Sequence, residues 1–216
     1  MLQDHAARAA THIALREVST PDLLMVYFSG IDAVEHQFWA YYEPQRFAEQ
    51  PPESEIEAFG HVIPAYYEYI DGLLADLLEG LPSETLIVLV SDHGHDPNQQ
   101  YRPSAPGSDY GRWTSGTHSH GPPGILLLSG PGVRHQQLQS AHVLDIAPTL
   151  LAALGVQPTS DMSGRVLEEA FTPEWRKSFP TDRIERRHVA NPGGQPTPAE
   201  VDPEILEKLR ALGYIK

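Results

Sequence analysis

The feature that most constrains this chain is an abrupt change of character within residues 86–98, LIVLVSDHGHDPN. Five apolar residues are followed directly by a cluster that contains Asp92, His93, His95 and Asp96. A short, continuous apolar run predicts a strand that is buried on both faces of a parallel sheet. In such sheets, ligands collect beyond the carboxyl ends of the strands. We therefore expect these carboxylates and imidazoles to belong to a site at the edge of a sheet.

Other segments place this strand in a larger pattern. Apolar runs predict three strands, at residues 22–29, 85–90 and 124–130. An amphipathic helix is predicted at 1–18, and helical character extends over 32–41. Apolar spacing near 3.6 residues predicts a long helix at 54–79 with a kink at Pro64. A further helix is predicted at 145–154, with Asp145 as N-cap, Pro148 in the first turn and Gly155 as the stop. This order predicts an α/β fold in which helices flank a mostly parallel sheet.

The chain divides by composition. We expect residues 1–171 to form the α/β domain, and residues 172–216 to form a polar, proline-rich tail that ends in a short helix over 203–215. A polar loop is expected over residues 94–118, and a loop of that length inside a compact domain is typically functional or disordered. Its residues Tyr110, Arg112 and Trp113 are candidates for shaping a substrate pocket.

Charge and composition restrict the classes of molecule that this chain is expected to bind. The chain has 216 residues, no cysteine, and 15 basic against 29 acidic residues, for a net charge of −14. An acidic surface disfavours nucleic-acid polymers and anionic membranes. A small anionic substrate is still compatible with it if bound cations dominate the local charge. No apolar run approaches the ~20 residues of a membrane span. No signal peptide is visible, so the compartment stays open: cytoplasmic if Met1 is the native start, exported if an upstream segment exists.

Polar clusters adjoin all three predicted strands. They are Asp32 with His36 four residues later, Asp92 with His93, and His118 with His120. Residues four apart on a helix share one face. Three crossings of one sheet edge would gather these groups, and His nitrogen and Asp oxygen are suitable ligands for Zn²⁺, Mn²⁺ or Fe. Two divalent cations would also remove the repulsion between neighbouring carboxylates.

Each cluster alone has a plainer interpretation. A D-x-x-x-H pair is most often a surface or capping pair, SDHG can be turn chemistry, and GTHSHG can be a glycine-bounded turn. The conjunction at three strands favours a metal site. His95, Asp96 and His120 stay ambiguous between supporting the ligands, contacting substrate and loop polarity.

Four stretches carry a family resemblance: DLLMVYFSGIDAVEHQFW, LIVLVSDHGHDPN, GTHSHGPPGILLLSGPGV and VLDIAPTLLAALGVQPTSDMSGRVL. Over residues 20–171 the chain resembles the type I phosphodiesterase/nucleotide pyrophosphatase family of the alkaline phosphatase superfamily. The resemblance implies an alkaline-phosphatase-like sandwich with a mostly parallel sheet. It also implies two divalent metal ions, with zinc expected. Asp32, His36 and His118 would hold one ion, and Asp92 and His93 would hold the other.

The family pattern also includes a further aspartate and a Thr or Ser nucleophile, which the resemblance places before residue 1. We therefore expect the N-terminal part of the fold to be missing, and the exposed sheet edge to cause aggregation or to be covered by a missing segment or a partner chain.

The expected function is metal-dependent hydrolysis of a small phosphate ester, of the phosphodiester or nucleotide pyrophosphatase type. The alternatives are a non-catalytic metal-binding pseudoenzyme or fragment, and a phosphomonoesterase, sulfatase or mutase of the same superfamily.

Overall fold

The computed structural model describes residues 2–17, 21–102, 114–180 and 182–185, and these divide into two compact units. The first unit comprises the described residues of 1–81 and 93–123, and the second comprises those of 82–92 and 124–185. The expected tail helix over 203–215 and the residues Tyr110, Arg112 and Trp113 lie outside the described residues. The domain boundary at residue 171 stays a prediction.

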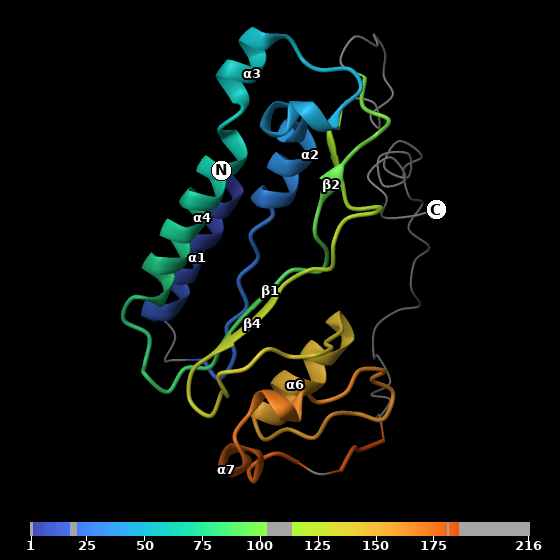
Figure 1. The fold of residues 1–216 in the computed structure, drawn as a ribbon. Helices are drawn as coiled ribbons and strands as arrows, with labels where there is room; N and C mark the ends of the chain where they lie inside the picture. Colours follow the sequence, from blue (N-terminus) through green and yellow to red (C-terminus); the bar gives the residue numbers. More distant parts are fainter. Residues whose placement is uncertain (1, 18–20, 103–113, 181, 186–216) are drawn as a thin grey trace, which may run out of the picture. The chain divides into compact units, whose positions relative to one another are not determined.

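Helices build most of the first unit (Figure 1). They are α1 (Leu2–Glu17), α2 (Gly30–Tyr42), the 3₁₀ turn η1 (Pro44–Arg46), α3 (Glu53–Phe59) and α4 (Val62–Leu78). α4 contacts both α1 and α2. Its buried face, with Tyr66, Ile70 and Leu73, packs against partly buried apolar side chains that include Ile31 and Val34 of α2. The helices predicted over 1–18 and 32–41 are therefore confirmed.

The predicted long helix over 54–79 is interrupted, but not by a kink at Pro64. It ends at Phe59 and resumes at Val62, so Pro64 lies in the first turn of α4. Proline has no N–H to donate, and its ring clashes with the carbonyl four residues earlier inside a helix. The first turn needs no such donor, because its N–H groups have no intrahelical partner. The helix therefore breaks at Gly60 and restarts just before the proline.

A buried carboxylate ties α1 to the start of α2. Asp4 accepts a hydrogen bond from the backbone N–H of Ser29 at 3.0 Å and another from the Tyr66 hydroxyl of α4 at 2.5 Å. Only 1% of Asp4 is exposed. Gly30 fits against this pair because it has no side chain: a Cβ there would lie 1.8 Å from the Tyr66 oxygen. Three helices thus meet at the residue that begins α2.

The strand predicted over 22–29 does not form. The backbone there has no regular secondary structure, and Leu23, Leu24, Met25 and Tyr27 are exposed. A strand requires a neighbour to accept and donate its backbone hydrogen bonds, and within the described residues no strand pairs with this segment. The apolar run therefore indicated a hydrophobic segment correctly and its secondary structure wrongly.

The second unit contains the other two predicted strands, shortened to β1 (Ile87–Val90) and β4 (Leu126–Ser129). They pair antiparallel, with Val88 opposite Leu128 and Val90 opposite Leu126. The unit continues with η2 (Val143–Asp145), α6 (Ile146–Ala153), η3 (Glu168–Ala170) and α7 (Pro173–Arg176). Its core joins Leu126 and Leu128 to buried residues of the later segments, namely Ala152, Leu167, Ala170, Phe171 and Phe179.

The structure agrees with the residues predicted to begin and end α6, except for the predicted N-cap. Pro148 lies in the first turn, and Gly155 follows the helix with φ of 72°, the left-handed conformation that suits glycine. Asp145 is the residue before the helix, but its side chain does not cap α6. It instead accepts hydrogen bonds from the N–H groups of His142 and Arg165, at 2.9 and 2.8 Å.

The described residues contain both helices and strands, but their two sheets are two-stranded and antiparallel. The second sheet pairs β2 (Asp96–Pro97) with β3 (Gly116–Thr117), inside the segment predicted as a polar loop. The predicted mostly parallel sheet is not present among these residues. An apolar run indicates that a strand is buried but not the direction of its neighbour. The sequence therefore could not predict whether the strands pair parallel or antiparallel.

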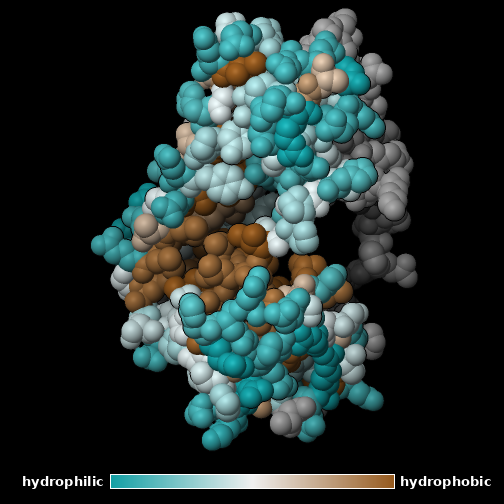
Figure 2. All heavy atoms as spheres, viewed as in Figure 1, coloured by the Kyte–Doolittle hydropathy of each residue, from teal (hydrophilic) through white to brown (hydrophobic). Residues whose placement is uncertain are grey.

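One face of the β1–β4 pair is open. Leu89 and Leu127 are opposite each other and exposed, and Figure 2 shows that hydrophobic residues remain at the molecular surface. None of the helices in the described part of the chain combines the length and the hydropathy that a membrane crossing requires.

Candidate metal centre

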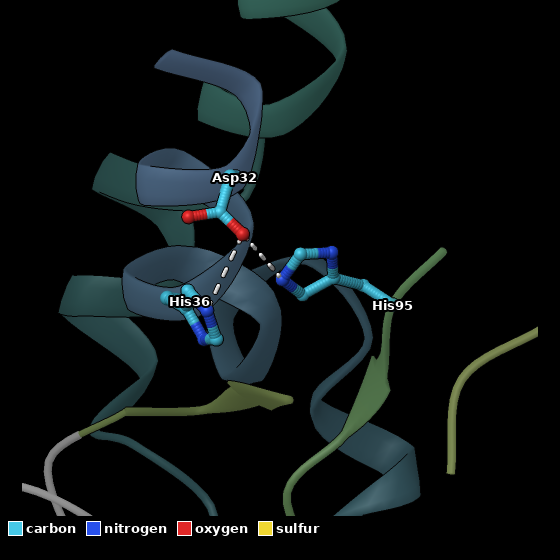
Figure 3. Close-up of side chains that lie close together, drawn as sticks. All are labelled: Asp32, His36 and His95. Carbon is cyan, nitrogen blue, oxygen red and sulfur yellow. Dashed lines mark ion pairs between the residues drawn. The ribbon is translucent and has the colours of Figure 1, made fainter. Parts of the chain in front are cut away.

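Helix α2 supplies the central carboxylate of the site. Asp32 and His36 are one helical turn apart, so both side chains lie on the same face, as the sequence predicted. Asp32 Oδ1 is 3.5 Å from His36 Nε2. That separation is too long for a good hydrogen bond and leaves the two atoms as a close ion pair (Figure 3).

The segment after residue 92 brings two more imidazoles to the same oxygen. His95 Nε2 lies 3.5 Å from Asp32 Oδ1, and His93 Nε2 lies 3.9 Å from it. Gly94 between them donates its N–H to the Pro122 carbonyl at 3.0 Å. A Cβ on Gly94 would come within 2.8 Å of Pro122, so this close approach of two backbones requires glycine.

The segment of β3 brings the fourth imidazole and fixes α2 from the other side. Ser115 donates its N–H to the His36 carbonyl at 2.7 Å. A Cβ on Gly116 would lie 2.3 Å from the Glu35 carbonyl oxygen, so only glycine allows β3 this close to the helix. His118 follows, and its ring stacks on that of His93 with centroids 4.2 Å apart and an interplanar angle of 29°.

The result is one carboxylate surrounded by four imidazoles. Two groups have ligand atoms that all lie within 4.8 Å of one another: Asp32 with His36 and His95, and Asp32 with His93 and His118. Both groups use Asp32. The residue types and the spacing suit a divalent cation that accepts nitrogen and oxygen ligands, such as Zn²⁺.

The hydrogen bonds around the cluster set the direction of two rings. His36 Nδ1 donates to the Gly116 carbonyl at 2.8 Å, and His95 Nδ1 lies 2.9 Å from Glu35 Oε2. When Nδ1 carries the proton, Nε2 presents a lone pair. Both Nε2 atoms and Asp32 Oδ1 are buried and make no hydrogen bond within the described residues. Buried polar atoms are normally satisfied, so three that converge on one point fit a bound cation.

The pKa values of three groups in this cluster are shifted, and not all in the same direction. Burial, and then the neighbouring imidazoles of His93, His36 and His95, lower the pKa of His118 to about 4. Burial opposes charge on His36 and Asp32 as well, but their attraction to each other outweighs it: the pKa of His36 is raised and that of Asp32 is lowered. Near neutral pH, His118 is therefore a neutral ring with a lone pair, which is the form that binds a metal.

Asp92, Asp96 and His120 are not in the two groups of clustered ligands found among the described residues. Asp92 belongs to the second unit and is in neither group of clustered ligands among the described residues. Asp96 forms an ion pair with Arg46 at 2.7 Å, and His120 is exposed. Two participants were missed by sequence reasoning, Glu35 and Tyr67, whose hydroxyl donates to Glu35 Oε1 at 2.9 Å. Nothing in the spacing of Tyr67 connected it to the clusters.

Comparison with known proteins agrees with the chemistry of the cluster. A family model described as type I phosphodiesterase / nucleotide pyrophosphatase matches residues 1–180. Neither the curated proteins nor the solved structures that were compared include a match to the chain. Since the matched region covers most of the 216 residues, the chain belongs to the type I phosphodiesterase / nucleotide pyrophosphatase family.

Proposed function

We propose that this protein hydrolyses phosphoric diesters or nucleotide pyrophosphate bonds with the help of divalent metal ions. The observation that carries the proposal is the convergence of four imidazoles on the buried Oδ1 of Asp32, in a chain of this family. Among the described residues, Asp32 Oδ1 and the Nε2 atoms of His36 and His95 are buried without a hydrogen bond. This arrangement is costly without a cation, because buried polar atoms need partners.

The proposed centre holds two ions, with zinc as the expected metal. The family resemblance assigns Asp32, His36 and His118 to one ion, and Asp92 and His93 to the other. The shared position of Asp32 in both clustered groups supports a role for this carboxylate at the middle of the centre. When bound, two such cations stabilise the charge on the attacking and leaving oxygens of a phosphoryl transfer.

The chain's own residues supply the positioning. Gly116 and Glu35 hold the outer nitrogens of His36 and His95, so the Nε2 atoms of both rings are directed toward Asp32. The substrate in this proposal is a small phosphate ester, which cations can attract despite the acidic composition of the chain. A polymeric nucleic acid is not proposed, since the net charge of −14 repels it.

The test is hydrolysis of a diester, a monoester and a sulfate ester by the full chain, with and without added Zn²⁺. We expect diester cleavage that a chelator abolishes. His36→Ala and His118→Ala should each lower both bound metal and activity by at least the 10–100-fold that loss of a supporting residue typically costs. His135→Ala is the matched control, because His135 is exposed and lies in the second unit.

The same experiment distinguishes the alternatives. Preferential cleavage of the monoester or sulfate ester would assign the protein to a different activity of the superfamily. Tight metal binding with no turnover of any ester would identify a non-catalytic metal-binding protein. Unchanged metal content and activity in both variants would refute the proposed centre.

A further inference from the structure

We infer that His95, held in place by Glu35 and Tyr67, is a ligand of the same cation as Asp32 and His36. This inference rests on the proposed function only in taking the cluster to bind a cation. The family resemblance assigned His118 to that cation, whereas sequence reasoning left His95 open between several roles.

The position of His95 is the first argument. Its Nε2 is as close to Asp32 Oδ1 as that of His36, at 3.5 Å in both cases, and the two rings meet edge to face with centroids 4.7 Å apart. Figure 3 shows both rings presenting a nitrogen toward the same carboxylate oxygen, from α2 and from the segment that leads into β2. His118 instead stacks on His93 and shares the second group with it.

Burial is the second argument. The His95 side chain is only 3% exposed, and its Nε2 has no hydrogen-bond partner in the described part of the chain. A histidine with a purely structural role would be expected to satisfy both nitrogens or to leave one in water. Here one face of the ring stacks on Trp39 with centroids 6.2 Å apart, while the nitrogen faces Asp32. The ring is thus arranged to present a lone pair to something that occupies the space beside Asp32.

The support behind His95 is the third argument. Glu35 is buried, accepts the His95 Nδ1–H with one oxygen, and accepts the Tyr67 hydroxyl with the other. Burial, and then the charge of Glu35, raise the pKa of Tyr67, so this hydroxyl stays protonated as the donor. A carboxylate behind a ligating histidine fixes its tautomer and increases its basicity. Glu35 and Tyr67 are therefore positioning residues, and they act on the cation through His95.

Helix α2 contributes to this ligand set in two ways. Glu35 and His36 are adjacent, so their side chains diverge around α2, yet both reach the same ligand set: His36 directly and Glu35 through His95. Both residues are buried. Glu35 and Tyr67 also line a cavity of about 510 Å³ with Trp39 and Ile63, so the back of the His95 support opens toward a hollow on the helix surface.

The test measures binding of metal alone by the full chain. Titration calorimetry with Zn²⁺ and the visible spectrum of bound Co²⁺ report affinity and ligand geometry without any turnover. We expect Glu35→Gln to weaken binding about 10–100-fold and to alter the Co²⁺ spectrum. His95→Ala should weaken it at least as much, and Tyr67→Phe less than Glu35→Gln. His135→Ala should bind as the wild type does, and circular dichroism checks that every variant is folded.

The outcomes separate this inference from the proposed function. If the wild type binds no cation, the proposed function itself fails. If the wild type binds and His36→Ala weakens binding while Glu35→Gln and His95→Ala do not, the inference is overturned and the proposed function stands. Should His95→Ala fail to fold, Glu35→Gln decides alone, because it preserves the size of the side chain.

Discussion

Replacing Gly30 with alanine should test whether the start of α2 is fixed by the buried pair of Asp4 and Tyr66. A Cβ at residue 30 would lie 1.8 Å from the Tyr66 oxygen, 2.1 Å from Asp4 Oδ2 and 2.5 Å from Tyr66 Cζ. These atoms are buried, and two of them form the 2.5 Å hydrogen bond between the helices. The added methyl group therefore has to separate them or move α2.

The expected loss of stability follows from two costs and one gain. Losing a hydrogen bond to a charged group costs about 1.5–3 kcal/mol. Overpacking a buried site costs a further ~1–3 kcal/mol. The better helix propensity of alanine returns at most ~1 kcal/mol. We therefore expect Gly30→Ala to lower the free energy of unfolding of the first unit by roughly 2–5 kcal/mol when these contributions are combined.

The assay is urea unfolding followed by circular dichroism at a helix wavelength, since the long helices α1, α2 and α4 belong to the first unit. Gly72→Ala is the matched control: Gly72 is exposed inside α4, and a Cβ there meets nothing within 4 Å. The control should gain up to ~1 kcal/mol. Tyr66→Phe in the Gly30→Ala background should recover part of the loss, because it removes the atom nearest the new methyl group. If Gly30→Ala were as stable as the Gly72→Ala control, the packing argument would be wrong.

Two further predictions concern single contacts. Asp76→Asn should lower the melting temperature at neutral pH, because hydrogen bonds from Arg8 and then His12 hold the pKa of Asp76 below its ordinary 3.8. A depressed carboxyl pKa gives stability that is present above pH 3.8 and is lost as the pH falls below it. The difference in melting temperature between Asp76→Asn and the wild type should therefore shrink in acid. A difference that does not change with pH would contradict this. Thr149→Val should destabilise the second unit by about 1–3 kcal/mol, because the buried Leu167 N–H loses its acceptor, the Thr149 hydroxyl at 3.0 Å. Urea unfolding measures this loss. A loss under ~0.5 kcal/mol would show that the hydrogen bond makes no net contribution to stability.

Helices were the most predictable part of the fold because their signal is local. The helical character of 32–41 predicted α2 within two residues of its observed ends, and Pro148 and Gly155 marked the start and end of α6. Pairing between strands is not local. The apolar segment 22–29 resembles 124–130 in composition, yet in the described part of the chain only the latter meets a partner strand, and that partner pairs antiparallel. Composition reports that a segment is hydrophobic, and the partner decides what it forms.

The site was predictable to the extent that its residues carry recognisable chemistry. Asp32, His36, His93 and His118 were named because a carboxylate and imidazoles followed predicted strands, and the structure brings these four together. The contributions of Glu35 and Tyr67 were not predictable, because they come from the far side of α2 and from α4, 32 residues apart in sequence. Such support depends on which helices pack together, and this is not encoded in any short motif.

The geometry of α2 shows why this centre tolerates so many buried polar atoms. The helix is held at its start by Asp4 and at its middle by Ser115, through hydrogen bonds from segments remote in sequence. These contacts hold the part of α2 that carries Asp32 and His36. In the first unit, buried atoms without a hydrogen bond therefore include Asp32 Oδ1 and the Nε2 atoms of His36 and His95, while the outer nitrogens of these two rings are satisfied. Unsatisfied polar atoms that gather at one point inside otherwise satisfied structure are expected at functional sites, and this supports the proposed metal centre. A random excess of polar residues would instead leave unsatisfied atoms scattered over the unit.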